Sequence, residues 1–244
     1  RQRQMCIRDS NYVNNITVDN SSSTGRLLNL HFNPHFYMRS QPLQWQQGWT
    51  SEEVQAHFTD MLSLLHQTLD GSVVLRGTTG EQTFGVFSYG GKTGLKLQSG
   101  FEGLLYAAGF DGNVTGYQVD NTGGTGALFI NANTDCVPSS AGEQSAYMKQ
   151  SAGTVRMVNG GMASFNWTIQ NGISVSGGNL SMRQVMFSAS GSNYTVNASG
   201  RAKVSLDGCL LLHKGAQSSD GVTFTNQSQN QVLDLKKGLL ANLT

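Results

Sequence analysis

The sequence predicts an all-β protein that folds as one right-handed parallel β-helix, a coil of short strands stacked turn on turn. Residues 153–212 carry the main pattern: segments of alternating polar and apolar residues, such as Thr154–Val158, recur between Gly, Asn and Ser. Three segments follow a small residue and a glycine, at Gly153, Gly178 and Gly200. Starts about two dozen residues apart are typical of a solenoid repeat. One coil cannot bury its own apolar side, so neighbouring coils must stack.

Composition limits the class and the partners of the protein. The chain has 244 residues, a formal net charge of +1, 13% charged residues, 30 Gly and 3 Pro. This length suffices for one large all-β domain. The charge balance gives no basic patch for nucleic acid, and no apolar run approaches the roughly 20 residues of a membrane helix. We therefore expect no nucleic-acid partner and no membrane span.

The first ten residues, RQRQMCIRDS, resemble the translated sequencing-adapter leader of open reading frames from environmental assemblies. Such a segment is excluded when a fold is argued. The β-helix domain is therefore expected to cover residues 11–244. We expect it to be truncated at its N-terminus, without its first coils and any signal peptide.

The first coil is followed by one departure from the strand pattern. Residues 15–18 and 26–32 are expected to be its strands, and residues 37–70 are expected to form a loop-helix insert. Thr50 and Glu53 have the spacing of a capping box. Apolar residues then recur at helical spacing and predict a helix over residues 51–69, ended by Gly71; they are Val54, Phe58, Met61, Leu62 and Leu65. The helix is expected to lie against the coil wall or over a groove.

Strand patterns resume after the insert. The sequence predicts strands over residues 73–76, 83–89, 94–97, 104–107, 116–119 and 127–130. Asp111-Gly112 is a turn signal, and residues 135–143 look like a looser loop. In the ladder of residues 153–212, four valines suit a narrow apolar interior: Val155, Val175, Val185 and Val204. The last strands are expected at 222–225, 231–235 and 239–243.

Five stretches carry a resemblance to a known family. They are HFNPHF at 31–36, the run at 71–97, GFDGNVTGYQVDN at 109–121, GTVRMVNGGMASF at 153–165 and VSLDGCLL at 204–211. The order of these five stretches along the chain resembles that in bacterial secreted right-handed β-helix proteins, which are described as pectate-lyase-like or glycoside-hydrolase-related. The resemblance covers residue 16 to the end. It implies polysaccharide as the substrate class and a secreted or cell-surface location.

The same superfold also carries phage tailspikes, adhesins and binding-only proteins. Polygalacturonases of this fold carry an Asn-x-Asp, an Asp-Asp, a Gly-His-Gly and an Arg-x-Lys set, and we expect none of these in that form here. The Arg-rich signature of pectate lyases is absent as well. Two hypotheses stay open: a carbohydrate-active or carbohydrate-binding protein, such as a glycoside hydrolase or polysaccharide lyase, and a structural or adhesive module. The expected state is a monomer or a homotrimer.

Three carboxylates are the candidate catalytic residues. Glycoside hydrolysis needs two carboxyl groups about 5 Å apart for retention, or about 6.5–9.5 Å apart for inversion. Glu81, Asp111 and Asp135 follow one another in successive coils next to the insert, where they could line one face. Glu81 and Asp111 are the expected acid and base. Asp111 precedes a glycine, which is also typical of a turn.

The candidate substrate-binding residues are His31, His35, Trp45, Trp49 and Arg76. A broad Trp face can stack on a sugar ring, although burial that anchors the insert explains the tryptophans equally simply. The two histidines flank Asn-Pro, and a metal would need a third ligand. We expect no metal and no cofactor. The ligand groove is expected beside residues 37–70, the one segment large enough to form a wall.

Overall fold

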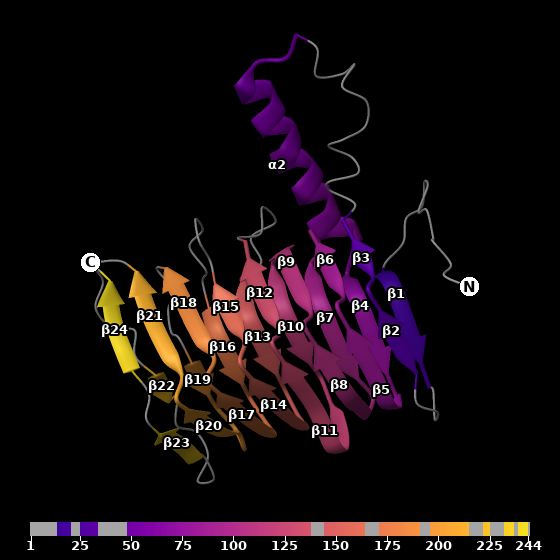
Figure 1. The fold of residues 1–244 in the computed structure, drawn as a ribbon. Helices are drawn as coiled ribbons and strands as arrows, with labels where there is room; N and C mark the ends of the chain where they lie inside the picture. Colours follow the sequence, from indigo (N-terminus) through magenta and orange to yellow (C-terminus); the bar gives the residue numbers. More distant parts are fainter. Residues whose placement is uncertain are drawn as a thin grey trace.

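The computed structural model confirms a parallel β-helix (Figure 1). It describes residues 14–20, 25–33, 48–137, 144–163, 171–190, 196–214, 222–224, 232–236 and 239–243. Successive strands join three eight-stranded parallel sheets in turn, so that three strands make one coil. The proposed leader, residues 1–10, lies outside the described residues.

The three sheets are named here A, B and C, in the order in which the chain visits them. Sheet A contains β1 (Asn14–Asp19), β4 (Gly71–Arg76), β7 (Thr93–Gln98), β10 (Thr115–Val119), β13 (Ala146–Gln150), β16 (Asn171–Val175), β19 (Val196–Ala198) and β22 (Val222–Phe224). Sheet B contains β2 (Arg26–Leu28), β5 (Thr79–Phe84), β8 (Phe101–Tyr106), β11 (Thr122–Ile130), β14 (Thr154–Val158), β17 (Asn179–Arg183), β20 (Lys203–Asp207) and β23 (Val232–Lys236). Sheet C contains β3 (His31–Phe32), β6 (Phe87–Tyr89), β9 (Gly109–Asn113), β12 (Asn133–Cys136), β15 (Gly161–Ala163), β18 (Met186–Ser190), β21 (Leu210–Lys214) and β24 (Leu239–Leu243).

In each coil whose corner between sheets B and C the structure describes, that corner is made by one left-handed residue. These residues have φ between 50° and 60° and are Asn29, Gly85, Ala107, Asn131, Asn159, Gln184 and Gly208. The first six donate their backbone N–H to the last residue of the next coil's sheet B strand, as in Asn131 to Val158 at 3.0 Å. The corner therefore turns the chain while leaving few backbone groups unpaired. Asn and Gly suit it because both tolerate left-handed backbone.

The interior is apolar and continuous from coil to coil. The four valines expected there are all at most 2% exposed: Val155, Val175, Val185 and Val204. Aromatic rings meet in the middle of the stack, where Tyr117 lies 5.7 Å from Phe110 and 5.3 Å from Phe129 between ring centroids. These three residues come from sheets A, C and B, so their contacts join all three sheets across the core.

The glycines that announce the repeats lie at the corner between sheets A and B, as the spacing predicts. Gly153, Gly178 and Gly200 have φ of 81°, 79° and 61°. Stacking here is so close that a Cβ on Gly178 would overlap the backbone of Gly153 in the preceding coil. A side chain at this position would meet both a strained conformation and a steric clash.

The helix α2 (Ser51–Thr68) begins with the predicted capping box. The Thr50 N–H donates to Glu53 Oε2 at 2.7 Å, and the Glu53 N–H donates to Thr50 Oγ1 at 3.2 Å. The expectation that the helix lies against the coil wall or over a groove is wrong. In Figure 1 it rises away from the coils, and the buried side chains are near its foot, at Leu65, His66 and Leu69. Within the described residues, no helix is long and apolar enough to cross a membrane.

Several predicted strand boundaries are wrong, either because a corner residue was included in a strand or because a short polar strand was not recognised. The strand expected over residues 26–32 is two strands, because Asn29 turns the chain between sheets B and C; Gly85 likewise divides residues 83–89. Asp111, expected in a turn, lies inside β9, and Asp135, expected in a loop, lies inside β12. The short strands of sheet C are polar and glycine-rich at this point, so their alternation is hidden.

Candidate functional site

The outer face of sheet C holds two carboxyl groups side by side. Phe110 and Thr134 point into the core and are at most 2% exposed, and the strand alternation then turns Asp111 and Asp135 outward. The register pairs Asp111 directly with Asp135 on the next coil. Neighbouring strands lie about 4.8 Å apart, so the stack of coils itself holds the two residues at this spacing.

Hydrogen bonding and burial distinguish the two carboxyl groups. The backbone N–H of Asp135 donates to Asp111 Oδ1 at 3.2 Å, which draws the Asp111 carboxyl toward the next coil. Asp135 Oδ1 is buried and has no hydrogen-bond partner among the described residues. An acidic oxygen in that position favours the protonated form, because the charged form has lost water without gaining a donor.

The pKa values follow from this environment. Burial raises the pKa of Asp135 to about 6, and the negative charge of Asp111 adds to the effect. Burial also raises the pKa of Asp111, while the N–H of Asp135 lowers it. Below about pH 6 Asp135 therefore holds a proton, while the N–H bond to Asp111 favours the charged form of that carboxyl group. This is the division of labour that acid catalysis needs.

Aromatic rings border the pair on the preceding coil. Tyr89 is the register partner of Asp111 on β6, and its ring lies over Gly112, where a Cβ would come within 2.7 Å of it. The ring of Phe87 similarly lies over Gly109, at 3.0 Å from a Cβ built there. Glycine is needed at both positions to make room for the rings. A shallow hollow adjoins them, lined in part by Phe87, Gly109 and Asn133.

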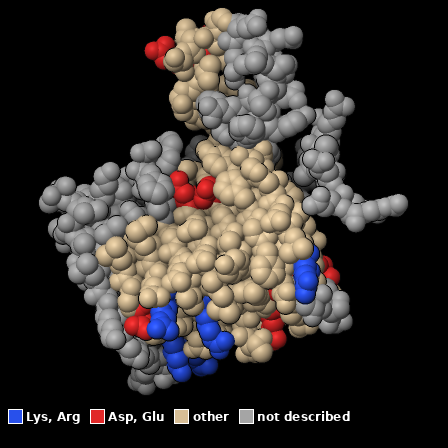
Figure 2. All heavy atoms as spheres, in the orientation of Figure 1, with Lys and Arg blue, Asp and Glu red and all other residues tan. Residues whose placement is uncertain are grey.

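The foot of the helix stands beside this face. His66 is 6% exposed, and its Nε2 lies 2.9 Å from the carbonyl oxygen of Gly112, the residue after Asp111. A partly buried ion pair near the foot joins Lys96 Nζ to Asp70 Oδ2 at 2.6 Å. Figure 2 shows acidic atoms at the base of the helix, with uncharged surface below them and to their right. We call Asp111, Asp135, Tyr89 and Phe87 the sheet C site.

Glu81, the third expected carboxylate, is not part of this site. It lies in β5 on sheet B, is 2% exposed, and its carboxyl group occupies the space left by the missing side chain of Gly25. Burial raises its pKa. Arg76 is the last residue of β4 on sheet A, and its Nη2 lies 3.5 Å from Asp19 Oδ2. The structure thus brings together two of the three expected acids and leaves Arg76 elsewhere.

The remaining expected binding residues are distributed differently. His31 on β3 contacts the ring of Phe87 edge to face, with 4.9 Å between centroids, and so borders the sheet C site. Trp49 precedes the helix at the end away from the coils, where its ring contacts His57 at 5.4 Å. The 18-residue helix is roughly 27 Å long, which separates Trp49 from the carboxyl pair. His35 and Trp45 lie outside the described residues.

Phe87 and Tyr89 were not identified as site residues from the sequence. A signal was present, because the two aromatic residues are two positions apart, as on one face of a strand, and the pair Gly90-Gly91 follows them. Two of the four polygalacturonase patterns also occur singly, as Asn133-Thr134-Asp135 and Arg201-Ala202-Lys203. The first includes Asp135, but the second lies at the start of β20 on sheet B. The structure therefore does not assemble them into one cluster.

No group of three or more His, Cys, Asp or Glu that could hold a metal ion occurs among the described residues. No family model, curated protein or solved structure matches the chain in the comparisons made. The chemistry of the site therefore has to be argued from the geometry of the sheet C site itself.

Proposed function

We propose that the protein is a carbohydrate-active enzyme that hydrolyses a polysaccharide at the sheet C site. The observation that carries the proposal is the pair of stacked carboxyl groups, one of which has a pKa raised to about 6. Strand spacing of about 4.8 Å is close to the roughly 5 Å separation of retaining glycosidases, and shorter than the separation in inverting enzymes. The pair therefore supports hydrolysis with retention.

In this mechanism Asp135 is the acid and Asp111 is the nucleophile. Asp135 gives its proton to the glycosidic oxygen as the C1–O bond breaks, and an Asp111 oxygen bonds to C1. The ionised Asp135 then takes a proton from water, whose oxygen displaces Asp111 from C1. At the end of the cycle Asp135 is protonated again and Asp111 is released from C1. Water is the only further reactant that the cycle requires.

The surroundings of the pair suit an extended sugar chain. Tyr89, Asp111 and Asp135 lie in one row across neighbouring strands, so the row runs along the stack of coils. A polymer lying along this row would place one sugar against the Tyr89 ring and the next bond at the carboxyl pair. Because polymers of this kind do not cross membranes, the proposal includes a secreted or cell-surface location.

The test is release of reducing ends from a panel of neutral and charged polysaccharides. We expect Asp135→Asn and Asp111→Asn each to lower kcat by a factor of about 100 to 10,000, the usual size of an acid or nucleophile effect. Glu81→Gln is the matched control, because it removes a buried carboxyl on sheet B and should keep full activity. Full activity in both aspartate variants would exclude this site.

The pH profile adds an independent check. Activity should fall as pH rises through about 6, because Asp135 loses the proton that the first step consumes. It should also fall at acid pH, where Asp111 becomes protonated and is no longer a nucleophile. A lyase would instead yield an unsaturated sugar. Detection of that product would show that the reaction is elimination and not hydrolysis.

A second candidate function is a structural or adhesive module, such as a tail-fibre or adhesin segment. The favouring observation is on sheet B, where small polar residues form outward rows such as Ser181 and Ser205. In that case the protein would bind glycans without cleaving any of them, and the aspartate variants would match the parent. A homotrimer measured by light scattering would further favour this function over a monomeric hydrolase.

A further inference from the structure

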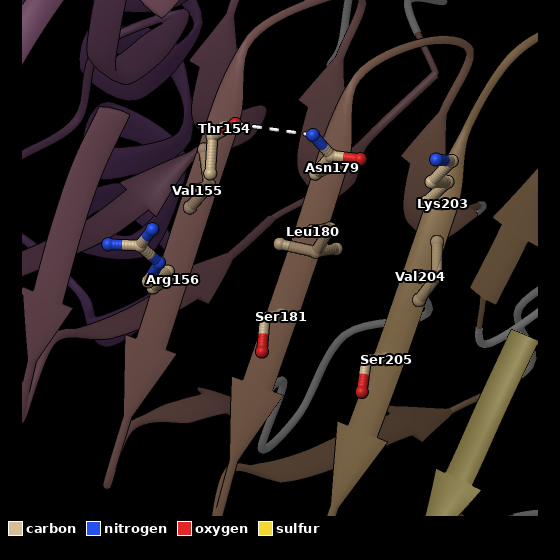
Figure 3. A pocket seen from close by; sticks show the side chains of 9 residues that line it. All are labelled: Thr154, Val155, Arg156, Asn179, Leu180, Ser181, Lys203, Val204 and Ser205. Atoms are coloured by element: carbon tan, nitrogen blue, oxygen red, sulfur yellow. Dashed lines mark hydrogen bonds between the residues drawn. The ribbon is translucent and has the colours of Figure 1, made fainter. Parts of the chain in front are cut away.

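Sheet B, which meets sheet C only at a corner of the β-helix, carries a shallow trough on its outer face. Figure 3 shows it across β14, β17 and β20, and its lining residues are Thr154, Val155, Arg156, Asn179, Leu180, Ser181, Lys203, Val204 and Ser205. Figure 1 places these strands along the lower edge and sheet C along the upper edge. The trough is therefore a separate surface from the carboxyl pair.

The residues that line the trough include two cations and no acid, and the nearest acid in the register is Asp234 on β23, the partner of Ser205. Between residues 144 and 210 the chain has five Lys and Arg residues and one acidic residue, Asp207. Asp207 Oδ2 lies 3.8 Å from Arg183 Nε, and no ion pair of Arg156 or Lys203 occurs among the described residues. Basic atoms gather on the same lower edge in Figure 2. Two exposed cations thus face one hollow without an acidic side chain in its lining.

The register fixes where the two cations stand. Arg156 on β14 is level with Ser181 and Ser205, whereas Lys203 on β20 is level with Asn179 and Thr154. The two cations are two strands and two residues apart, so their Cα atoms lie roughly 12 Å from each other. Between them the floor is built of small side chains, as Figure 3 shows for Ser181 and Ser205.

The floor offers hydrogen bonds to a sugar. Ser181 and Ser205 carry hydroxyl groups on the outer face. Asn179 Nδ2 donates to Thr154 Oγ1 at 3.3 Å, and Figure 3 shows its side-chain oxygen on the side of Lys203. Hydroxyls and amides both donate and accept, which suits the hydroxyl groups of a sugar. The cations suit the carboxylate or sulfate groups that acidic sugars carry.

From this arrangement we propose that the trough binds an anionic sugar chain bearing carboxylate or sulfate groups. It binds the chain at a distance from the sheet C site, so the binding stands whether or not that site is catalytic. Nucleic acid fits less well, because two unpaired cations neutralise few phosphates and no aromatic residue lines the trough for base stacking.

The test measures binding by titration calorimetry at low salt. The probes are a polyuronate, a sulfated glycan, a neutral glycan and a single-stranded DNA of similar charge. We expect one or both acidic glycans to bind in a way that depends on Arg156 and Lys203, whereas any binding of the neutral glycan at the sheet C site should not depend on them. Arg156→Gln and Lys203→Gln should each weaken binding roughly threefold and together about tenfold, the effect of removing exposed charged contacts. The preferred probe decides between carboxylate and sulfate.

The matched control is Lys149→Gln, which removes the same charge from β13 on sheet A. It should leave affinity unchanged, as should Asp135→Asn on sheet C. Equal weakening by Lys149→Gln would show attraction to overall charge and overturn the proposal. Equal affinity for DNA would overturn it as well, and loss of binding in Asp135→Asn would place the glycan at sheet C instead.

Discussion

At the scale of single residues, direction decides the role of a side chain. In β16 the side chain of Val175 is 0% exposed, while Ser174 beside it is partly exposed. The alternation of a strand turns successive residues to opposite faces, and in a closed coil one face is the core. The same alternation sends Phe110 inward and Asp111 outward.

Val175→Asp should therefore destabilise the fold strongly. An unpaired carboxylate in the apolar interior costs at least about 3 kcal/mol, which is a large share of the stability of a domain. Ser174→Asp is the control, because it adds the same group one residue away on the outer face, where effects stay within about 0.5 kcal/mol. Urea unfolding measures both, and equal midpoints for the two variants would contradict the register of sheet A.

The candidate site could be predicted in part at this scale. Asp111 and Asp135 are recognisable because carboxyl groups in successive coils can stack. Their grouping with Glu81 was wrong, because the single strand expected over residues 83–89 concealed the corner at Gly85 that separates sheet B from sheet C. Glu81 lies on sheet B and both aspartates on sheet C. The aromatic border was missed because it depends on rings folding over Gly109 and Gly112.

At the scale of elements, local signals predicted the helix better than its placement. Thr50 and Glu53 fix its start through two reciprocal hydrogen bonds. Its direction depends on the few contacts at its foot, where Leu65 and Leu69 are buried and His66 reaches Gly112. Such contacts join residues nearly fifty positions apart. Periodicity within the helix contains no information about them.

Thr50→Ala should loosen the start of the helix without affecting the coils. Loss of the capping oxygen costs about 1 kcal/mol, so the Glu53 amide should exchange its hydrogen about fivefold faster. Thr59→Ala is the control, since its hydroxyl bonds only to the Gln55 carbonyl inside the helix. Hydrogen exchange followed by NMR measures both. Unchanged protection at Glu53 in Thr50→Ala would show that the capping box does not hold the helix start.

At the scale of the whole molecule, the solenoid converts order along the chain into position along an axis. Residues 71–136 contain five acidic and three basic residues, whereas residues 144–210 contain one acidic and five basic residues. Because each coil stacks on the one before it, this division becomes an acidic half and a basic half. The sheet C site belongs to the first half and the sheet B trough to the second.

The repeat architecture was predictable at this scale for the same reason. Coils repeat, so signals such as Gly153, Gly178 and Gly200 add up along the chain, and all three lie at one corner of the structure. Sheet C was largely hidden, because β9, β12 and β15 are short and rich in Gly and polar residues. The pairing of these three strands with one another follows only after the strands of sheets A and B have been aligned from coil to coil.

The proposed function requires Asp111 and Asp135 to act as one acid pair. The most direct measurement is an NMR titration of protein labelled at the Asp side-chain carboxyl carbons. We expect one Asp with a pKa of about 6. This resonance should be absent in Asp135→Asn. Its pKa should shift downward in Asp111→Asn, because the neighbouring charge is removed. Glu81→Gln should leave that resonance unchanged. If every Asp titrates below about pH 5, or if the high value survives in Asp135→Asn, the pair is not the acid site described here.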